Sequence, residues 1–170
     1  MELEMLMAIA CRAMAFQPNV AEMRAVRAIV ITSLIVGTMD ITSAIIITLL
    51  RGGTIMRLMQ FIASGLLGKQ AFQGGLPIAA LGLALHFLIA VGLVTVFYFA
   101  SRNLAFLRQH PVPSGIIYGL VVFAVMNLIV LPLSAAAARH SLSGDLIQIG
   151  IHMFVIGLPT SLLLRRFSYD

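Results

Sequence analysis

The chain contains very little charge for its length. Only 10% of its 170 residues are Asp, Glu, Lys or Arg, whereas a soluble domain contains about 25% charged residues. Hydrophobic residues make up 61% of the chain, and the mean hydropathy is +1.06. A water-facing surface cannot be built from this composition, so we expect one compact helical membrane domain.

Other scarce features exclude further classes. Cys11 is the only cysteine, so no internal disulfide can form. Tryptophan is absent, so an aromatic belt would rely on Tyr98, Tyr118, Tyr169 and the phenylalanines. The chain has no G-x-S-x-G, phosphate-loop, C-x-x-C or H-E-x-x-H motif. We therefore predict that the protein is not an enzyme and has no resident cofactor.

Four long apolar segments are present, at about 28–50, 77–100, 115–138 and 146–164. Segment 77–100 contains no Asp, Glu, Lys or Arg. As a helix it is roughly 36 Å long, enough to cross a hydrocarbon core of about 30 Å. None of the segments shows the apolar–polar alternation of a barrel strand. We predict an all-α, integral membrane four-helix bundle over 23–170, preceded by an N-terminal cytoplasmic segment, 1–22.

Segment 1–22 is less apolar than the rest of the chain. Its first dozen residues are expected to form a short surface helix. Glu2 and Glu4 occupy the positions where a signal peptide would be basic, so a signal peptide is not expected. Met23, which precedes an Arg-x-x-Arg sequence and the first apolar run, is an alternative start of the chain.

A shorter amphipathic stretch, closed by Gly-Gly at both ends, separates the first two spans. Its polar positions recur at helical spacing at Arg57, Gln60 or Phe61, and Ser64. Its apolar positions are Ile55, Leu58, Met59, Ile62 and Leu66. This pattern predicts an interfacial helix whose polar side faces water.

Lys and Arg are divided unequally between the two sides of the predicted bundle. The side of both termini holds seven: Arg12, Arg24, Arg27, Arg102, Arg108, Arg165 and Arg166. The other side holds four: Arg51, Arg57, Lys69 and Arg139. The positive-inside rule then predicts that both termini are cytoplasmic, and it explains the net charge of +5 without a nucleic-acid partner. Arg165 and Arg166 are also expected to contact anionic lipid head groups, at about 1 kcal/mol each.

Four polar side chains, one from each span, fall at similar depth. Asp40 and Asn127 lie near the centres of the first and third spans. His86 and His152 both lie about 4 Å outward of the midplane. Small residues share the helix faces of Asp40 and His86, so both faces are expected to be buried between helices. The expected partner of Asp40 is His86 or His152.

Several roles fit this layer. The plainest is interhelical hydrogen bonding, which contributes about 1 kcal/mol and sets helix register. Proton-linked transport is a second role, in which Asp40 titrates and a polar stripe of Asp145, Gln148 and His152 leads to it. His86 and His152 are also candidate axial ligands of a b-type haem, or metal ligands together with Asp40.

Three runs of sequence resemble a family. They are ALGLALHFLIAVGLVTVFYFASR, FLRQHPVPSGIIYGLVVFAVMNLIVLPLS and IHMFVIGLPTSLLLRR. With His86, Pro132-Leu133, His152 and the closing Arg165-Arg166, the chain from about Met23 to Arg166 resembles uncharacterised bacterial four-helix inner-membrane proteins, distantly the YagU family. The resemblance implies a bacterial inner-membrane location with both termini inside. It implies no activity, substrate or cofactor, because that family is a domain of unknown function.

The preferred prediction is a non-enzymatic accessory or stabilising subunit of a larger membrane complex. Its partners would be the lipid bilayer and either other membrane subunits or a second copy of the chain. The alternative is a small proton-linked carrier that uses Asp40, His86 and His152, and a bis-histidine haem protein is a further alternative. A polar cavity that reaches Asp40 would favour the carrier.

Overall fold

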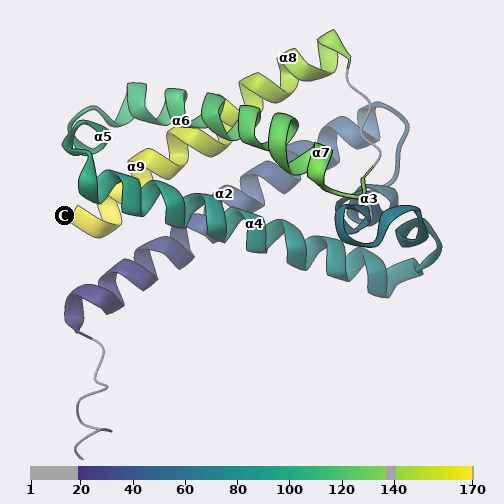
Figure 1. The fold of residues 1–170 in the computed structure, drawn as a ribbon, viewed down its shortest axis with the longest axis horizontal. Helices are drawn as coiled ribbons and strands as arrows, with labels where there is room; N and C mark the ends of the chain where they lie inside the picture. The colour runs from purple at the N-terminus through teal and green to yellow at the C-terminus, as the bar shows by residue number, and fades with distance from the viewer. Residues whose placement is uncertain (1–18, 137–140, 170) are drawn as a thin grey trace, which may run out of the picture.

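The computed structural model describes residues 19–136 and 141–169, and every regular element in these ranges is helical. Four helical runs are long and apolar enough to cross a membrane: α2 (Val20–Leu50), α4 (Gly75–Asn103), Pro111–Leu133 and Leu142–Ser168. The predicted all-α bundle is confirmed, and the chain is a multi-pass membrane protein (Figure 1). The expected N-terminal surface helix, with Arg12, lies outside the described residues, and so does Arg139.

Two span boundaries differ from the predicted ones. α2 begins at Val20 rather than at 28, because Asn19 and Glu22 form a capping box ahead of the apolar run. The Asn19 side chain accepts a hydrogen bond from the Ala21 amide at 2.9 Å, and the Glu22 carboxylate accepts one from the Asn19 amide at 3.3 Å. The third helical run ends at Leu133 rather than near 138, because the backbone is extended at Ser134.

The third and fourth spans each contain a π-helical turn directly before a proline. The third span consists of α6 (Pro111–Val125), η2 (Met126–Val130) and α7 (Leu131–Leu133). The fourth consists of α8 (Leu142–Ile151), η3 (His152–Gly157) and α9 (Leu158–Tyr169). Pro132 and Pro159 have no amide hydrogen to donate to the usual carbonyl four residues earlier, so the hydrogen-bond ladder is rearranged around them. The distortion near the two prolines therefore takes the form of a wider turn.

Glycines allow the closest helix crossings. α6 packs against η3 and α9, and α2 packs against α4 and α9. A Cβ added to Gly119 of α6 would lie 2.5 Å from Met153 Cα, and one added to Gly115 would lie 2.7 Å from Leu158 Cα. The sequence Gly115-x-x-x-Gly119 is therefore a packing motif, as small residues at this spacing predict.

The predicted helix between the first two spans is α3 (Ile55–Leu67), capped by the Thr54 side chain. Its sides differ in part from the expected ones: Met59 is buried and Arg57 is exposed as predicted, but two polar and two apolar positions are reversed. Gln60 and Ser64 are buried, and Ile55 and Leu66 are exposed. The reason is that α3 packs closely across α4, where Gly82 has no side chain and contacts the α3 backbone at Met59.

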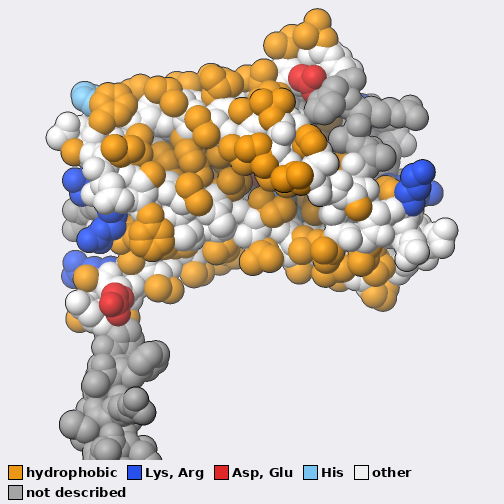
Figure 2. Space-filling model, viewed as in Figure 1, with side chains coloured by type: hydrophobic (Ala, Val, Ile, Leu, Met, Phe, Trp, Pro, Cys, Tyr) orange, Lys and Arg blue, Asp and Glu red, His pale blue; other side chains and the backbone are white. Residues whose placement is uncertain are grey.

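Two clusters of buried apolar side chains lie toward opposite ends of the bundle. One consists of Ala28, Val94, Phe97, Tyr98 and Leu164, and the other consists of Ile41, Met59 and Ala79. The outer surface shows a broad apolar band, with Lys and Arg side chains gathered at its two ends (Figure 2). The start of α2 and the end of α9 lie at the same end (Figure 1).

Candidate proton site and its access route

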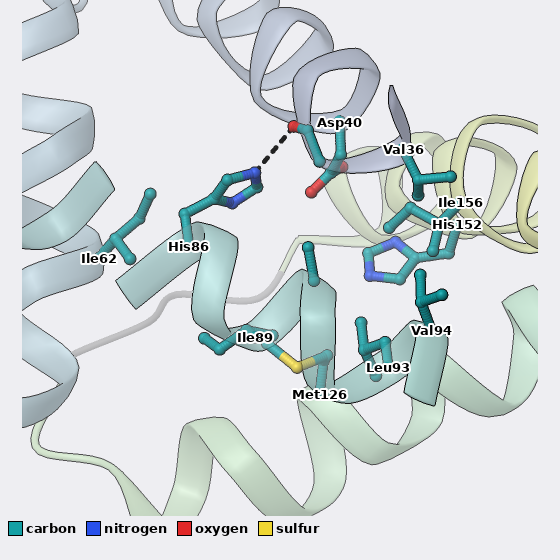
Figure 3. A pocket seen from close by; sticks show the side chains of 12 residues that line it. Val36, Asp40, Ile62, His86, Ile89, Leu93, Val94, Met126, His152 and Ile156 are labelled. Atoms are coloured by element: carbon teal, nitrogen blue, oxygen red, sulfur yellow. Dashed lines mark hydrogen bonds between the residues drawn. The ribbon is translucent and has the colours of Figure 1, made fainter. Parts of the chain in front are cut away.

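Three of the four predicted polar side chains meet at one cavity. Asp40 of α2, His86 of α4 and His152 of η3 line a space of about 130 Å³ (Figure 3). The remaining lining is almost entirely apolar: Val36, Gly37, Ile62, Ile89, Ala90, Leu93, Val94, Met126 and Ile156. The Asp40 carboxyl group lies between the two imidazole rings in this view. The faces of α2 and α4 that carry small residues were predicted to be buried between helices. Asp40 and His86 lie on these faces and line the same cavity.

His86 is held against the backbone of α2. Its Nε2 lies 2.9 Å from the carbonyl oxygen of Gly37. Because a carbonyl oxygen only accepts, Nε2 carries the hydrogen, and in the neutral ring Nδ1 is the proton acceptor. The short distance depends on Gly37, since a Cβ at this position would lie 2.9 Å from the Phe87 ring. The contact fixes both the orientation and the neutral tautomer of His86.

His152 is the first residue of the π-helical turn η3 and is only 8% exposed. Its Nδ1 donates to the Gln148 carbonyl oxygen at 2.8 Å, so Nε2 is the acceptor in the neutral ring. The ring edge packs on Phe123 with a centroid distance of 5.7 Å. The backbone of Gly119 contacts the His152 carbonyl group. The position of His152 is therefore determined by the crossing of α6 and η3.

The Asp40 carboxylate has no hydrogen-bond or ion-pair partner among the residues that the structure describes. Its backbone carbonyl accepts from Ser43 Oγ at 2.7 Å, but its side chain interacts with His86 and His152 only through electrostatic attraction. A half-buried carboxyl group with unused acceptors, flanked by two imidazoles that each keep one basic nitrogen, is an arrangement that binds and exchanges a proton.

Asn127 is separated from these three residues. It lies in η2, where its Nδ2 donates to the Phe123 carbonyl oxygen of its own helix at 2.9 Å. It lines a second cavity of about 230 Å³ together with Asp145 and Gln148. Its chain neighbour Met126 faces the first cavity instead. Three side chains of the predicted layer therefore converge, and the fourth, Asn127, lines a different cavity.

A third cavity, of about 170 Å³, lies between the other two. It shares Asp40 with the first cavity, and it shares Arg51, Gln148 and Ile47 with the second. The three cavities are therefore neighbours, and their linings extend from Arg51 and Asp145 to the histidine pair. Asp145, Gln148 and His152, predicted as a polar stripe, all line these cavities.

Arg51 also lines these cavities, although the sequence analysis counted it only among the cations of one side of the bundle. A signal for it is present, because Asp40, Ala44, Thr48 and Arg51 recur at spacings of four, four and three. This spacing places them on one face of α2. All four line the third cavity.

The two cofactor hypotheses stay predictions. The cavity has a volume of 130 Å³, below the roughly 300–1,000 Å³ of sites for drug-sized ligands, and Nε2 of His86 bonds to Gly37. In the ranges 19–136 and 141–169, no group of three or more His, Cys, Asp or Glu side chains is arranged to hold a metal ion.

No family model, curated protein or solved structure matches this chain. The resemblance to the YagU family therefore stays a prediction.

Proposed function

We propose that the protein is a small, non-enzymatic, proton-linked carrier of the bacterial inner membrane, with both termini in the cytoplasm. The observation that supports this best is the cavity shared by Asp40, His86 and His152, which adjoins cavities lined in part by polar side chains. Ionisable side chains inside a membrane domain are costly, and they commonly serve ion and substrate pathways. Structural hydrogen bonding explains His86, which bonds between helices, and His152, which bonds within its own span. It leaves the Asp40 carboxyl group unexplained.

In the proposed mechanism, Asp40 is the group that binds the transported proton. A proton enters from the end that bears Arg51 and Asp145, passes Gln148, and reaches the Asp40 carboxylate. The acceptor nitrogens of His86 and His152 are the next bases in the cavity. Protonation removes the charge of Asp40 and so reduces the cost of closing the apolar cavity around it.

Toward the termini, the cavity borders a buried apolar cluster. Val94 lines the cavity and also belongs to the cluster with Phe97 and Leu164, whose side chains are 2% and 0% exposed. Release toward the termini requires this cluster to open, which is the alternation that a carrier needs.

The size of the cavity limits the solute. Its volume of 130 Å³ is similar to that of an engineered protein cavity of about 150 Å³ that holds benzene. We therefore propose a solute of about six non-hydrogen atoms with a largely apolar body. A pure proton pathway is the limiting case with no solute.

The test is proton flux into liposomes that contain the purified full-length protein and a pH-sensitive dye, driven by a potassium diffusion potential. Asp40→Asn is expected to reduce the flux at least about tenfold, because the amide does not ionise. Glu22→Gln, which changes another α2 carboxyl group to an amide outside the site, serves as the control and is expected to leave the flux unchanged.

Unchanged flux in Asp40→Asn would remove the carrier proposal. The accessory-subunit prediction would then become the leading one, and stoichiometric co-purification of other membrane subunits is its direct test.

A further inference from the structure

A fourth cavity lies apart from the proton route, where α2 begins and α9 ends. Its volume is about 350 Å³, larger than any of the three cavities of the route. Arg24 and Arg27 of α2 and Arg166 of α9 contribute three guanidinium groups to its lining. We call it the arginine cleft.

The cations of this cleft have no counter-charge within the described parts of the chain. No described carboxylate pairs with Arg24, Arg27 or Arg166, and the nearby Glu22 side chain caps its own helix. Ser168 also lines the cleft, and its buried Oγ has no hydrogen-bond partner among the described residues. Three adjacent positive charges repel one another, and a buried hydroxyl without a partner loses its hydration. An anion with several acceptor oxygens would relieve both costs.

The rest of the lining indicates where such an anion comes from. Ala28, Ile31 and Phe167 make one side of the cleft apolar. Farther toward the middle of the bundle, α2 has exposed apolar side chains, including Val30 and Leu34. A cleft with cations at the end of a span and an apolar wall beside it matches a molecule with a charged head and a hydrocarbon tail.

We propose that the arginine cleft binds the phosphate group of an anionic phospholipid. Arg27 and Arg166 approach the phosphate oxygens from two different helices, and guanidinium groups suit this task because their donors form a planar fork. The acyl chains lie along the apolar surface of α2. Water-soluble phosphate esters share the recognised chemistry, and the experiment separates the two sources.

The chain contains a matched control. Arg165 and Arg166 are adjacent and equally charged, yet only Arg166 lines the cleft. The sequence predicted equal lipid contacts for both residues. A specific site distinguishes them, whereas diffuse attraction to an anionic surface does not.

The experiment measures binding of short-chain phosphatidylglycerol and phosphatidylcholine to the full-length protein in neutral detergent by native mass spectrometry. Phosphatidylglycerol is expected to bind wild type and Arg165→Gln equally. Loss of a charge-assisted phosphate contact should weaken binding at least about tenfold in Arg27→Gln and Arg166→Gln. Circular dichroism and elution volume verify that each variant is folded. If Arg166→Gln is not, Arg166→Lys and Arg165→Lys replace the pair, and the first is expected to bind more weakly.

The outcomes separate clearly. Displacement of the lipid by glycerol 3-phosphate at equal concentration would assign the site to soluble phosphate esters, and failure to displace it would assign the site to the lipid. Equal weakening in Arg165→Gln and Arg166→Gln would overturn the proposal, because it would show diffuse attraction. Equal affinity for phosphatidylcholine would also overturn it. Neither result affects the proton site, which lies in separate cavities.

Discussion

Gly119→Ala should destabilise the bundle more than any other single methyl group added to α6, because it acts at the crossing that positions His152. The new Cβ would lie 2.5 Å from Met153 Cα and 2.6 Å from the His152 carbonyl carbon, whereas ordinary contacts begin at 3.4 Å. The difference, 3.4 minus 2.5, requires α6 and η3 to separate by at least about 0.9 Å, and the His152 carbonyl oxygen is nearer still. Both contacts are with backbone, so no side-chain rotation can relieve them.

The magnitude follows from two opposing terms. Overpacking of a tight interface costs about 1–3 kcal/mol, and a pure backbone contact belongs in the upper part of this range. Replacing Gly by Ala within a helix returns about 1 kcal/mol of helix propensity. The net destabilisation expected for Gly119→Ala is therefore about 1–2 kcal/mol.

Gly92→Ala is the matched control, because a Cβ at Gly92 of α4 would meet nothing within 4 Å. It should be neutral, or more stable by up to about 1 kcal/mol. The two variants thus differ by about 1–3 kcal/mol, which corresponds to about 2–12 °C in melting temperature for a chain of this size. Thermal unfolding in detergent, followed by circular dichroism, measures this difference. Equal melting temperatures would refute the close crossing of α6 and η3.

Three other predictions use the same unfolding assay. Tyr118→Phe removes the hydrogen bond that Tyr118 Oη donates to the Leu93 carbonyl oxygen at 2.6 Å, and it should cost about 1 kcal/mol; an unchanged melting temperature would show that this bond between α6 and α4 is not formed. The double change Thr32→Val and Thr160→Val should be neutral or stabilising, because both hydroxyls are buried without a partner among the described residues; a loss above about 1 kcal/mol would reveal a missing bond. His86→Phe should cost about 1 kcal/mol for the lost contact with α2, and a cost near zero would contradict that contact.

The fold was largely predictable from the sequence because its signals are long. Four apolar runs with basic flanks predict four helices regardless of how they pack. Boundaries were less predictable, because they depend on short polar features. The Asn19 and Glu22 cap extends α2 beyond its apolar run, and the extended backbone at Ser134 ends the third helical run early.

The depth of the site residues along their spans was predictable, but the direction in which each side chain points was only partly so. Depth follows from counting residues along a span, and it correctly brought Asp40, His86 and His152 together. Direction depends on helix rotation, and the π-helical turns η2 and η3 alter rotation within a span in a way that a regular helical period does not capture. This explains why Asn127 lines a different cavity. For α3, close packing on Gly82 outweighed the amphipathic pattern and turned Gln60 inward.

The position of the site within the bundle connects its geometry to movement. Asp40 and His86 come from α2 and α4, and the contact of His86 with Gly37 ties these two helices together. His152 comes from η3, which packs against α6 through Gly119 and Gly157. The cavity therefore lies where one tightly joined pair of helices meets the other. A displacement between the pairs changes the separation of Asp40 from His152 while it preserves that of Asp40 from His86. In the proposed mechanism, protonation of Asp40 changes its interaction with His152, so the state of one carboxyl group biases how closely the two pairs approach.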